Sequence, residues 1–227
     1  MKTKDALRSA VWKILQQEKV ARFPGAEGRI PNFIGAEKCA AVLAQSRLWR
    51  AAKTIKCNPD APQRAIRQRA LVPRLSSRKP FLELDPKGLK VSPFRASTIG
   101  GAAKYGRPVS VDEMNPVDLI VCGSVAVNRS GARIGKGGGY SDLEYALLRE
   151  AGKLTDRTPI VTSVHPLQVV DAEIPMTEHD IPLDAIVTPS RLIALKPRYP
   201  KPKGIYWPLL SPEKIEAIPL LKRRRRG

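Results

Sequence analysis

Ten residues near the middle of the chain combine the residue types that bind phosphate. Positions 133–142 read RIGKGGGYSD, with two cations, Arg133 and Lys136, and one carboxylate, Asp142. The four glycines are Gly135, Gly137, Gly138 and Gly139. Glycine tolerates positive φ and lets the backbone approach a ligand, so successive N–H groups can surround an anion. We predict that these N–H groups bind β- and γ-phosphates, while Arg133 and Lys136 neutralise charge on a transferring phosphoryl group.

The residues after the glycines have the pattern of a helix start. Ser141 and Glu144 are spaced as a capping box, which predicts a helix from Ser141 to about Lys153. The positive end of this helix would face the glycine run. Asp142 is then placed to hold a Mg²⁺ ion that bridges phosphate oxygens. The alternative for Asp142 is a carboxylate that interacts only with the helix dipole.

Two known glycine-rich motifs do not fit this run. The dinucleotide fingerprint needs a glycine where Tyr140 stands, and the Gly-Lys-Ser/Thr of a Walker A loop is missing. A flexible surface turn remains the alternative to a phosphate site. The two flanking cations and the predicted helix favour the phosphate site. Tyr140 either stacks on a ligand ring or packs under the loop.

The run 131–142 resembles the ATP loop of the 5-formyltetrahydrofolate cyclo-ligase family. Three other stretches are similar to that family: KDALR at 4–8, VDLIV at 117–121 and HDIPLD at 179–184. The resemblance implies ATP and Mg²⁺ as cofactors and a small folate as substrate. It also implies that Lys4, Arg8 and Tyr140 contact the nucleotide and that Asp180 assists the metal. Without the resemblance, the alternative for Lys4 and Arg8 is a solvated basic face of a helix, and the alternative for Asp180 is a residue in a turn.

Four further stretches are similar to the methenyltetrahydrofolate synthetase domain-containing branch of the family. They are residues 30–33, 56–60, 123–127 and 141–146. The resemblance places Gln63 where active enzymes carry a glutamate that handles the formyl-pterin, and Gln63 and Tyr140 are thus implied as substrate-binding residues. An amide keeps the hydrogen bonding of a carboxylate but loses its charge. The paired tyrosines of the family appear here as Tyr140 and Ser141.

Three functions follow from these residues. A cyclo-ligase would phosphorylate the formyl oxygen of 5-formyltetrahydrofolate with ATP, and attack by the neighbouring nitrogen would expel phosphate and give 5,10-methenyltetrahydrofolate. The second function is that of an ATP-binding paralogue with another substrate, which Gln63 suggests. The third is that of a basic RNA-interacting protein.

The composition favours anionic partners. The 227 residues carry a net charge of +19, and part of it lies in the C-terminal run 222–226, KRRRR. Such charge attracts nucleotides, folates and nucleic acids. No RNP or helix-turn-helix motif is visible, so we expect nucleic-acid binding to be nonspecific at most. We expect a monomer or homodimer.

Targeting and metal-site patterns are missing from the sequence. No apolar run approaches the roughly 18 residues of a membrane span, and the first residues lack the apolar core of a signal peptide. Three scattered cysteines and two histidines form no metal motif and suit a reducing compartment. We therefore expect a cytoplasmic protein without a membrane partner.

Helical and strand patterns alternate along the chain. Helices are predicted over 4–20, 35–51 and 62–70, and strands over 53–57, 71–73, 81–84, 117–126, 159–164, 185–188 and 192–195. This alternation predicts an α/β fold, a three-layer Rossmann-like sheet with helices on both faces. The resemblance implies the same cyclo-ligase or NagB/RpiA-like class. We expect one domain over 1–195, then a Pro-rich linker and basic tail over 196–227.

Overall fold

The computed structural model describes residues 3–23, 25–70, 74–76 and 79–226. Its centre is a five-stranded sheet in the order β1-β5-β8-β9-β10. The strands are β1 (Ile55–Cys57), β5 (Leu119–Cys122), β8 (Ile160–Ser163), β9 (Ala185–Val187) and β10 (Leu192–Ala194). The first four are parallel, and β10 is antiparallel to β9. The parallel strands are buried along their length and mostly apolar, as expected for a sheet covered on both faces; Lys56 in β1 is a charged exception.

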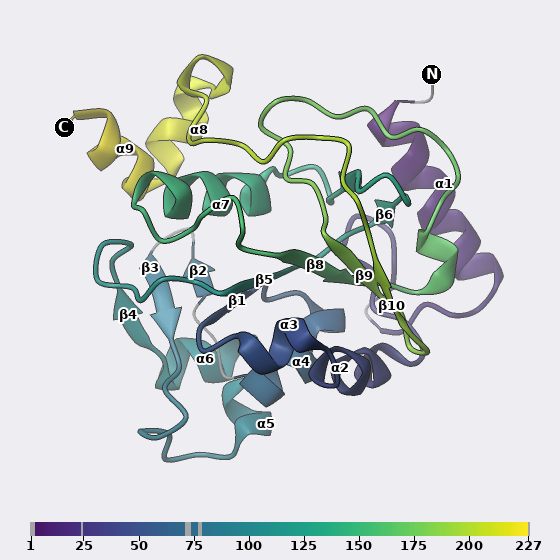
Figure 1. The fold of residues 1–227 in the computed structure, drawn as a ribbon, viewed down its shortest axis with the longest axis horizontal. Helices are drawn as coiled ribbons and strands as arrows, with labels where there is room; N and C mark the ends of the chain where they lie inside the picture. Colours follow the sequence, from purple (N-terminus) through teal and green to yellow (C-terminus); the bar gives the residue numbers. More distant parts are fainter. Residues whose placement is uncertain (1–2, 24, 71–73, 77–78, 227) are drawn as a thin grey trace.

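Helices cover both faces of this sheet (Figure 1). Helix α7 (Tyr140–Glu150) lies on one face, where Tyr145 and Leu148 pack with Ile120. Helices α2 (Ala36–Ala44) and α4 (Arg64–Ala70) lie on the other face and pack against the neighbouring residues Leu119 and Val121. Side chains that alternate along β5 therefore enter different cores. The predicted three-layer α/β fold is confirmed.

Helix α1 (Lys4–Gln17) is placed beside a small second sheet. Its buried stripe of Leu7, Val11 and Leu15 packs with Ala126 and Ile134. These two residues belong to the antiparallel strands β6 (Ala126–Val127) and β7 (Arg133–Ile134). The single strand predicted over 117–126 is wrong, because it forms β5 and β6 in different sheets. The chain leaves the first sheet at Gly123, where a Cβ atom would lie 2.6 Å from Asp60 Oδ2.

The remaining elements complete the layers. A three-stranded antiparallel sheet contains β2 (Arg74–Ser76), β3 (Lys79–Glu83) and β4 (Arg107–Val109). The other helices are α3 (Arg47–Ala51), α5 (Pro93–Ala96), α6 (Ile99–Tyr105) and the 3-10 turns η1 (Ala61–Gln63) and η2 (Pro166–Gln168). The strand predicted over 71–73 lies outside the described residues. The helix predicted over 35–51 is instead two, because Ser46 Oγ accepts from Trp49 N and caps a new helix.

The C-terminal residues form η3 (Trp207–Leu209), α8 (Pro212–Ala217) and α9 (Pro219–Arg226). Helices α8 and α9 lie beyond α7 from the sheet (Figure 1). Ile215, Ile218 and Leu221 pack with Leu143 and Leu147 of α7. Among the described residues, no helix has the length and apolar character to cross a membrane.

Candidate functional site

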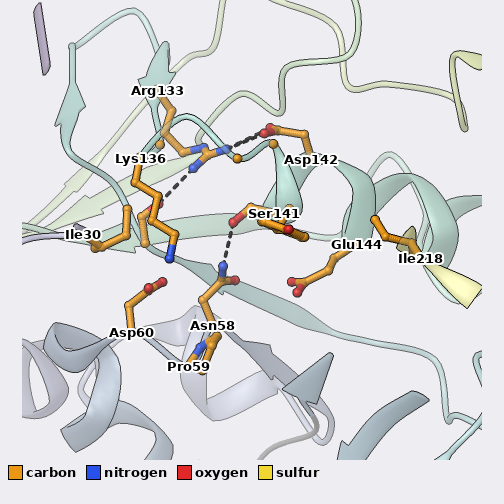
Figure 2. A pocket seen from close by; sticks show the side chains of 15 residues that line it. Ile30, Asn58, Pro59, Asp60, Arg133, Lys136, Ser141, Asp142, Glu144 and Ile218 are labelled. Carbon is orange, nitrogen blue, oxygen red and sulfur yellow. Dashed lines mark hydrogen bonds and ion pairs between the residues drawn. The ribbon is translucent and has the colours of Figure 1, made fainter. Parts of the chain in front are cut away.

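A cavity of about 150 Å³ lies at the carboxyl ends of β1 and β5. Residues 58–60 follow β1 and Gly123 follows β5, and residues 135, 136 and 138–142 form the facing wall (Figure 2). Ligands of open α/β sheets bind at such strand ends. The predicted glycine loop is therefore part of this cavity.

The glycine loop is held by its carbonyl groups. Arg8 Nε donates to Gly135 O at 2.8 Å, and Lys214 Nζ donates to Gly138 O at 3.0 Å. Gly137 and Gly139 have positive φ angles of 107° and 64°, which favour glycine. Within the described ranges, the N–H groups of residues 135–139 donate to no protein acceptor. A loop with cations on its carbonyls and free N–H groups fits an anionic ligand.

The predicted capping box is wrong. Helix α7 begins at Tyr140, and its N-cap is Gly139 in the left-handed conformation, with no side-chain cap. Ser141 and Glu144 thus lie inside the helix and face the sheet. Ser141 Oγ accepts from Asn58 Nδ2 at 2.6 Å, and Glu144 forms a buried ion pair with Lys56 of β1. These contacts fasten the first turns of α7 to the end of β1.

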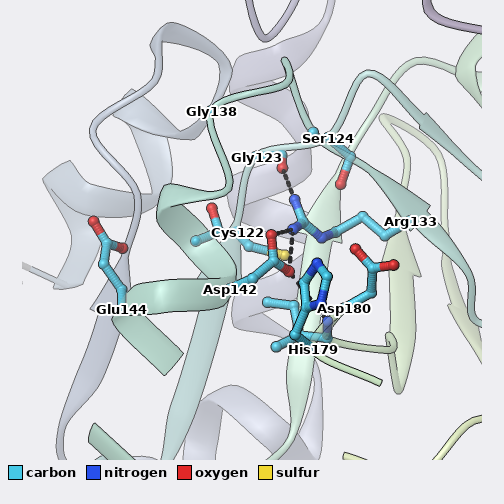
Figure 3. A network of polar contacts seen from close by, with 12 residues as sticks. Cys122, Gly123, Ser124, Arg133, Gly138, Asp142, Glu144, His179 and Asp180 are labelled. Atoms are coloured by element: carbon cyan, nitrogen blue, oxygen red, sulfur yellow. Dashed lines mark hydrogen bonds and ion pairs between the residues drawn. The ribbon is translucent and has the colours of Figure 1, made fainter. Parts of the chain in front are cut away.

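Arg133 and Asp142 form an ion pair below the loop (Figure 3). The guanidinium donates to the two carboxylate oxygens at 2.8 and 3.0 Å and to Gly123 O at 2.9 Å. Asp142 also accepts from Ile181 N at 3.1 Å. Only 3% of the Arg133 side chain and 14% of the Asp142 side chain are exposed. Both residues line the cavity, but much of their hydrogen-bonding capacity is used within the protein.

Asp180 and Lys4 form a second ion pair, with 2.5 Å between Nζ and Oδ2. Asp180 also accepts from the backbone and hydroxyl of Thr177, each at 2.7 Å. Burial opposes the charged form, but the hydrogen bonds from Lys4 and Thr177 outweigh it and hold the pKa of Asp180 below its usual value. Neither residue is among those that line the cavity, but Asp180 lies beside Arg133 and Asp142 at its edge (Figure 3).

Lys136 and Asp60 face each other across the cavity (Figure 2). Lys136 is exposed on the loop, and Asp60 is half-buried after β1. Burial raises the pKa of Asp60, although Lys136 and Arg67 partly offset this effect. In the described part of the chain, the Asp60 carboxylate has no ion-pair partner, so it is open to a ligand.

Gln63 does not reach this cavity. Its side chain is fully buried and donates to Ser163 Oγ at 3.0 Å, while its Oε1 has no partner among the described residues. The structure thus differs from the position implied by the resemblance. Asn58, Pro59 and Asp60, which precede Gln63, line the cavity instead. Tyr140 does line the cavity; it is 48% exposed, and its ring covers Gly138.

The described residues contain no group of three or more His, Cys, Asp or Glu side chains that would hold a metal by themselves. Magnesium bound with a nucleotide takes only one or two carboxylates and completes its shell with phosphate oxygens and water. Three carboxylates line the cavity, Asp60, Asp142 and Glu144, and Glu144 is paired with Lys56. This donor set fits a magnesium–nucleotide ligand.

The model of the 5-formyltetrahydrofolate cyclo-ligase family matches residues 1–189. The chain belongs to this family. It is 41% identical to the methenyltetrahydrofolate synthase domain-containing protein of Mus musculus and 38% identical to that of Homo sapiens. Both alignments cover 98% of this chain but only 63% and 61% of the relatives, so the chain spans about three fifths of their length.

A solved structure in the family has the same fold. The 5,10-methenyltetrahydrofolate synthetase of Aquifex aeolicus superposes with a TM-score of 0.51 at 21% identity, over 85% of this chain and 93% of that one. A 5-formyltetrahydrofolate cyclo-ligase of Arabidopsis thaliana is 36% identical over 37% of this chain and 31% of its own length.

Several site residues of this family member were missed in the sequence. Lys56, Asn58 and Asp60 lie in or after a three-residue strand, far from the loop in sequence. One signal was present, since Lys56 interrupts an apolar strand and a buried lysine needs a partner. That partner is Glu144, whose spacing from Ser141 favours a helix cap instead.

Proposed function

We propose that this cyclo-ligase family member binds Mg·ATP at residues 135–139 and uses it to close 5-formyltetrahydrofolate to 5,10-methenyltetrahydrofolate, with release of ADP and phosphate. The free N–H groups of the glycine loop carry this proposal, because they lie beside Lys136 at the mouth of the cavity. The family of the chain supports the folate part.

Some of the site residues bind the ligand, and others position those that do. The loop N–H groups and Lys136 bind the phosphates and stabilise the charge of the transferring phosphoryl group. Asp142 or Asp60 would hold Mg²⁺, which would neutralise part of the charge of the phosphates. Arg133 keeps Asp142 in place, and Lys4, Arg8 and Asp180 fix the helix that supports the loop.

The folate part of the ligand belongs in the rest of the cavity. Asp60 is the open carboxylate there, and we assign to it the binding of a protonated ligand nitrogen. Tyr140, half-exposed at the same mouth, is placed to stack on a ring. Gln63 supports the chain from below through Ser163.

The test measures binding and turnover separately. Calorimetric titration gives the affinity for Mg·ATP, and absorbance follows methenyltetrahydrofolate formed from 5-formyltetrahydrofolate and ATP. Lys136→Ala should weaken Mg·ATP binding about tenfold or more, because a charge-assisted contact contributes about 1.5–3 kcal/mol. Lys38→Ala, an exposed change on the opposite face of the sheet, is the matched control.

Two outcomes would contradict the proposal. If the wild-type protein did not bind Mg·ATP at saturating concentration, the proposed nucleotide site would be excluded. Confirmed Mg·ATP binding without methenyltetrahydrofolate formation would leave the site but assign it to another substrate.

A further inference from the structure

The C-terminal segment 204–218 lies against the glycine loop, although the family match ends at residue 189. Lys214 Nζ donates to Gly138 O at 3.0 Å, and a Cβ on Gly139 would also lie 3.0 Å from that nitrogen. Ile218 lines the main cavity (Figure 2). A segment beyond the family domain therefore contributes directly to the site.

The segment is firmly attached to α7. Ile215 and Ile218 are buried with Leu143 and Leu147. Ile205 N donates to Glu150 Oε1 at 2.9 Å, at the far end of the same helix. Residues on a packed helix keep their side chains in place better than residues on a free tail. Lys214 is thus held at the loop by the packing of its own helix.

A second cavity of about 90 Å³ continues the site between α7 and this segment. Gly139 and Asp142 line both cavities, so the two meet at the start of α7. Lys214 and Tyr206 line the second cavity from the C-terminal side. A ligand on the loop N–H groups would have Lys136 on one side and Lys214 on the other.

Within the described part of the chain, no acidic side chain balances the charge of Lys214. Its ammonium has one neutral acceptor, and no carboxylate among the described residues lies within ion-pair distance of it. A lysine ammonium has three donors, so two remain for a ligand.

We propose that segment 204–218 is a fixed wall of the site and that Lys214 binds the phosphate groups of the ligand on the glycine loop. This inference rests on the proposed function in that the ligand there is a polyphosphate. The segment adds a cation that the matched part of the family domain does not supply.

The experiment uses the full chain and two probes, Mg·ATP and inorganic triphosphate with magnesium. Lys214→Met keeps the apolar stem and removes the charge, whereas Lys214→Arg keeps the charge. Lys203→Met, at an exposed position of the C-terminal region, is the matched control. We expect Lys214→Met to lower the affinity for both probes about tenfold or more. The Arg variant and the control should bind within about twofold of wild type, and the loss should shrink at high salt.

Lys214→Gln separates ligand binding from loop support, because glutamine can keep the hydrogen bond to Gly138 O without a charge. If Lys214→Met melts at a lower temperature than wild type, the affinity of Lys214→Gln is used to test the inference instead. Wild-type affinity in Lys214→Gln would overturn the inference. Triphosphate binding that depends on Lys214, without ATP binding, would support the inference and overturn the nucleotide part of the proposed function. Wild-type protein that binds neither probe would overturn both.

Discussion

Arg133 and Asp142 are joined by two hydrogen bonds under the glycine loop, and both side chains are almost fully buried. Removing one partner leaves an uncompensated charge, which costs about 3–5 kcal/mol in buried pairs. We expect Arg133→Met and Asp142→Leu each to lower the free energy of unfolding by roughly that amount. The double variant should lose clearly less than the sum, and urea unfolding measures all four proteins. Additive losses would show that the pair is not coupled.

Asp60 should make stability depend on pH in a recognisable direction. Burial raises its pKa in the folded state, so the folded protein binds this proton more tightly than the unfolded chain. The resulting stability is fully present below the unfolded pKa and is lost as pH rises through the folded pKa. We therefore expect the free energy of unfolding of wild type, measured with urea, to fall relative to that of Asp60→Asn as pH rises through this window.

The matched control for Asp60 is Asp171→Asn, at an exposed position. The difference in free energy of unfolding between this variant and wild type should stay constant over the same pH range. A constant difference for Asp60→Asn as well would contradict the raised pKa.

Asp180 should act in the opposite direction. Its pKa is lowered in the folded state despite burial, through hydrogen bonds from Lys4 and Thr177. Its contribution is present above the unfolded pKa and is lost as pH falls through the folded pKa. Lys4→Ala should cost about 1 kcal/mol at neutral pH, since Lys4 is partly exposed to solvent, and less at the acid end. An equal cost at every pH would exclude the ion pair as its cause.

A substitution at Gly138 tests whether the close packing of this glycine against Tyr140 matters for ligand binding. A Cβ at Gly138 would lie 2.7 Å from the ring, so Gly138→Ala must displace either the ring or the loop. We expect Mg·ATP affinity to fall about tenfold or more, as when a charge-assisted contact is lost. Gly88→Ala, where a Cβ meets nothing within 4 Å, is the control. Unchanged binding in Gly138→Ala would show that the loop tolerates the shift.

The basic end of the chain should matter little for the nucleotide. Deleting residues 222–227 keeps Leu221 but removes the ion pairs of Lys222 with Glu216 and of Arg224 with Asp112. We expect unchanged Mg·ATP affinity, because charges beyond about 8 Å are largely screened at physiological salt. RNA binding by the full chain should fall steeply with salt and disappear with the deletion. Sequence-selective RNA binding that survives the deletion would favour the folded domain as an RNA-binding protein.

The sequence predicts those parts of the site that are local. The glycine loop is visible because its cations and glycines lie within ten residues, and the sheet is visible in its alternating apolar runs. Asp60 and Lys56 reach the loop only through the pairing of β1 with β5 and the docking of α7. No local pattern specifies such contacts between distant segments.

Helix boundaries show the same limit. Ser141 and Glu144 have the spacing of a cap, but the N-cap is Gly139, two residues before Ser141, and both side chains therefore lie inside the helix and face the sheet. Segment 204–218 shows the limit for tertiary packing. Its two prolines, and the Pro-rich run before it, are typical of a linker. Its apolar side chains, Ile215 and Ile218 among them, gain their role only by packing on Leu143 and Leu147 of α7.

The end of the family match at residue 189 has a practical consequence for protein production. A truncation at that boundary would uncover Leu143 and Leu147, which the C-terminal helices bury. Such contiguous apolar surface promotes self-association. A recombinant domain should therefore extend at least to Leu221, or it will precipitate and underestimate the affinity of the protein for its ligands.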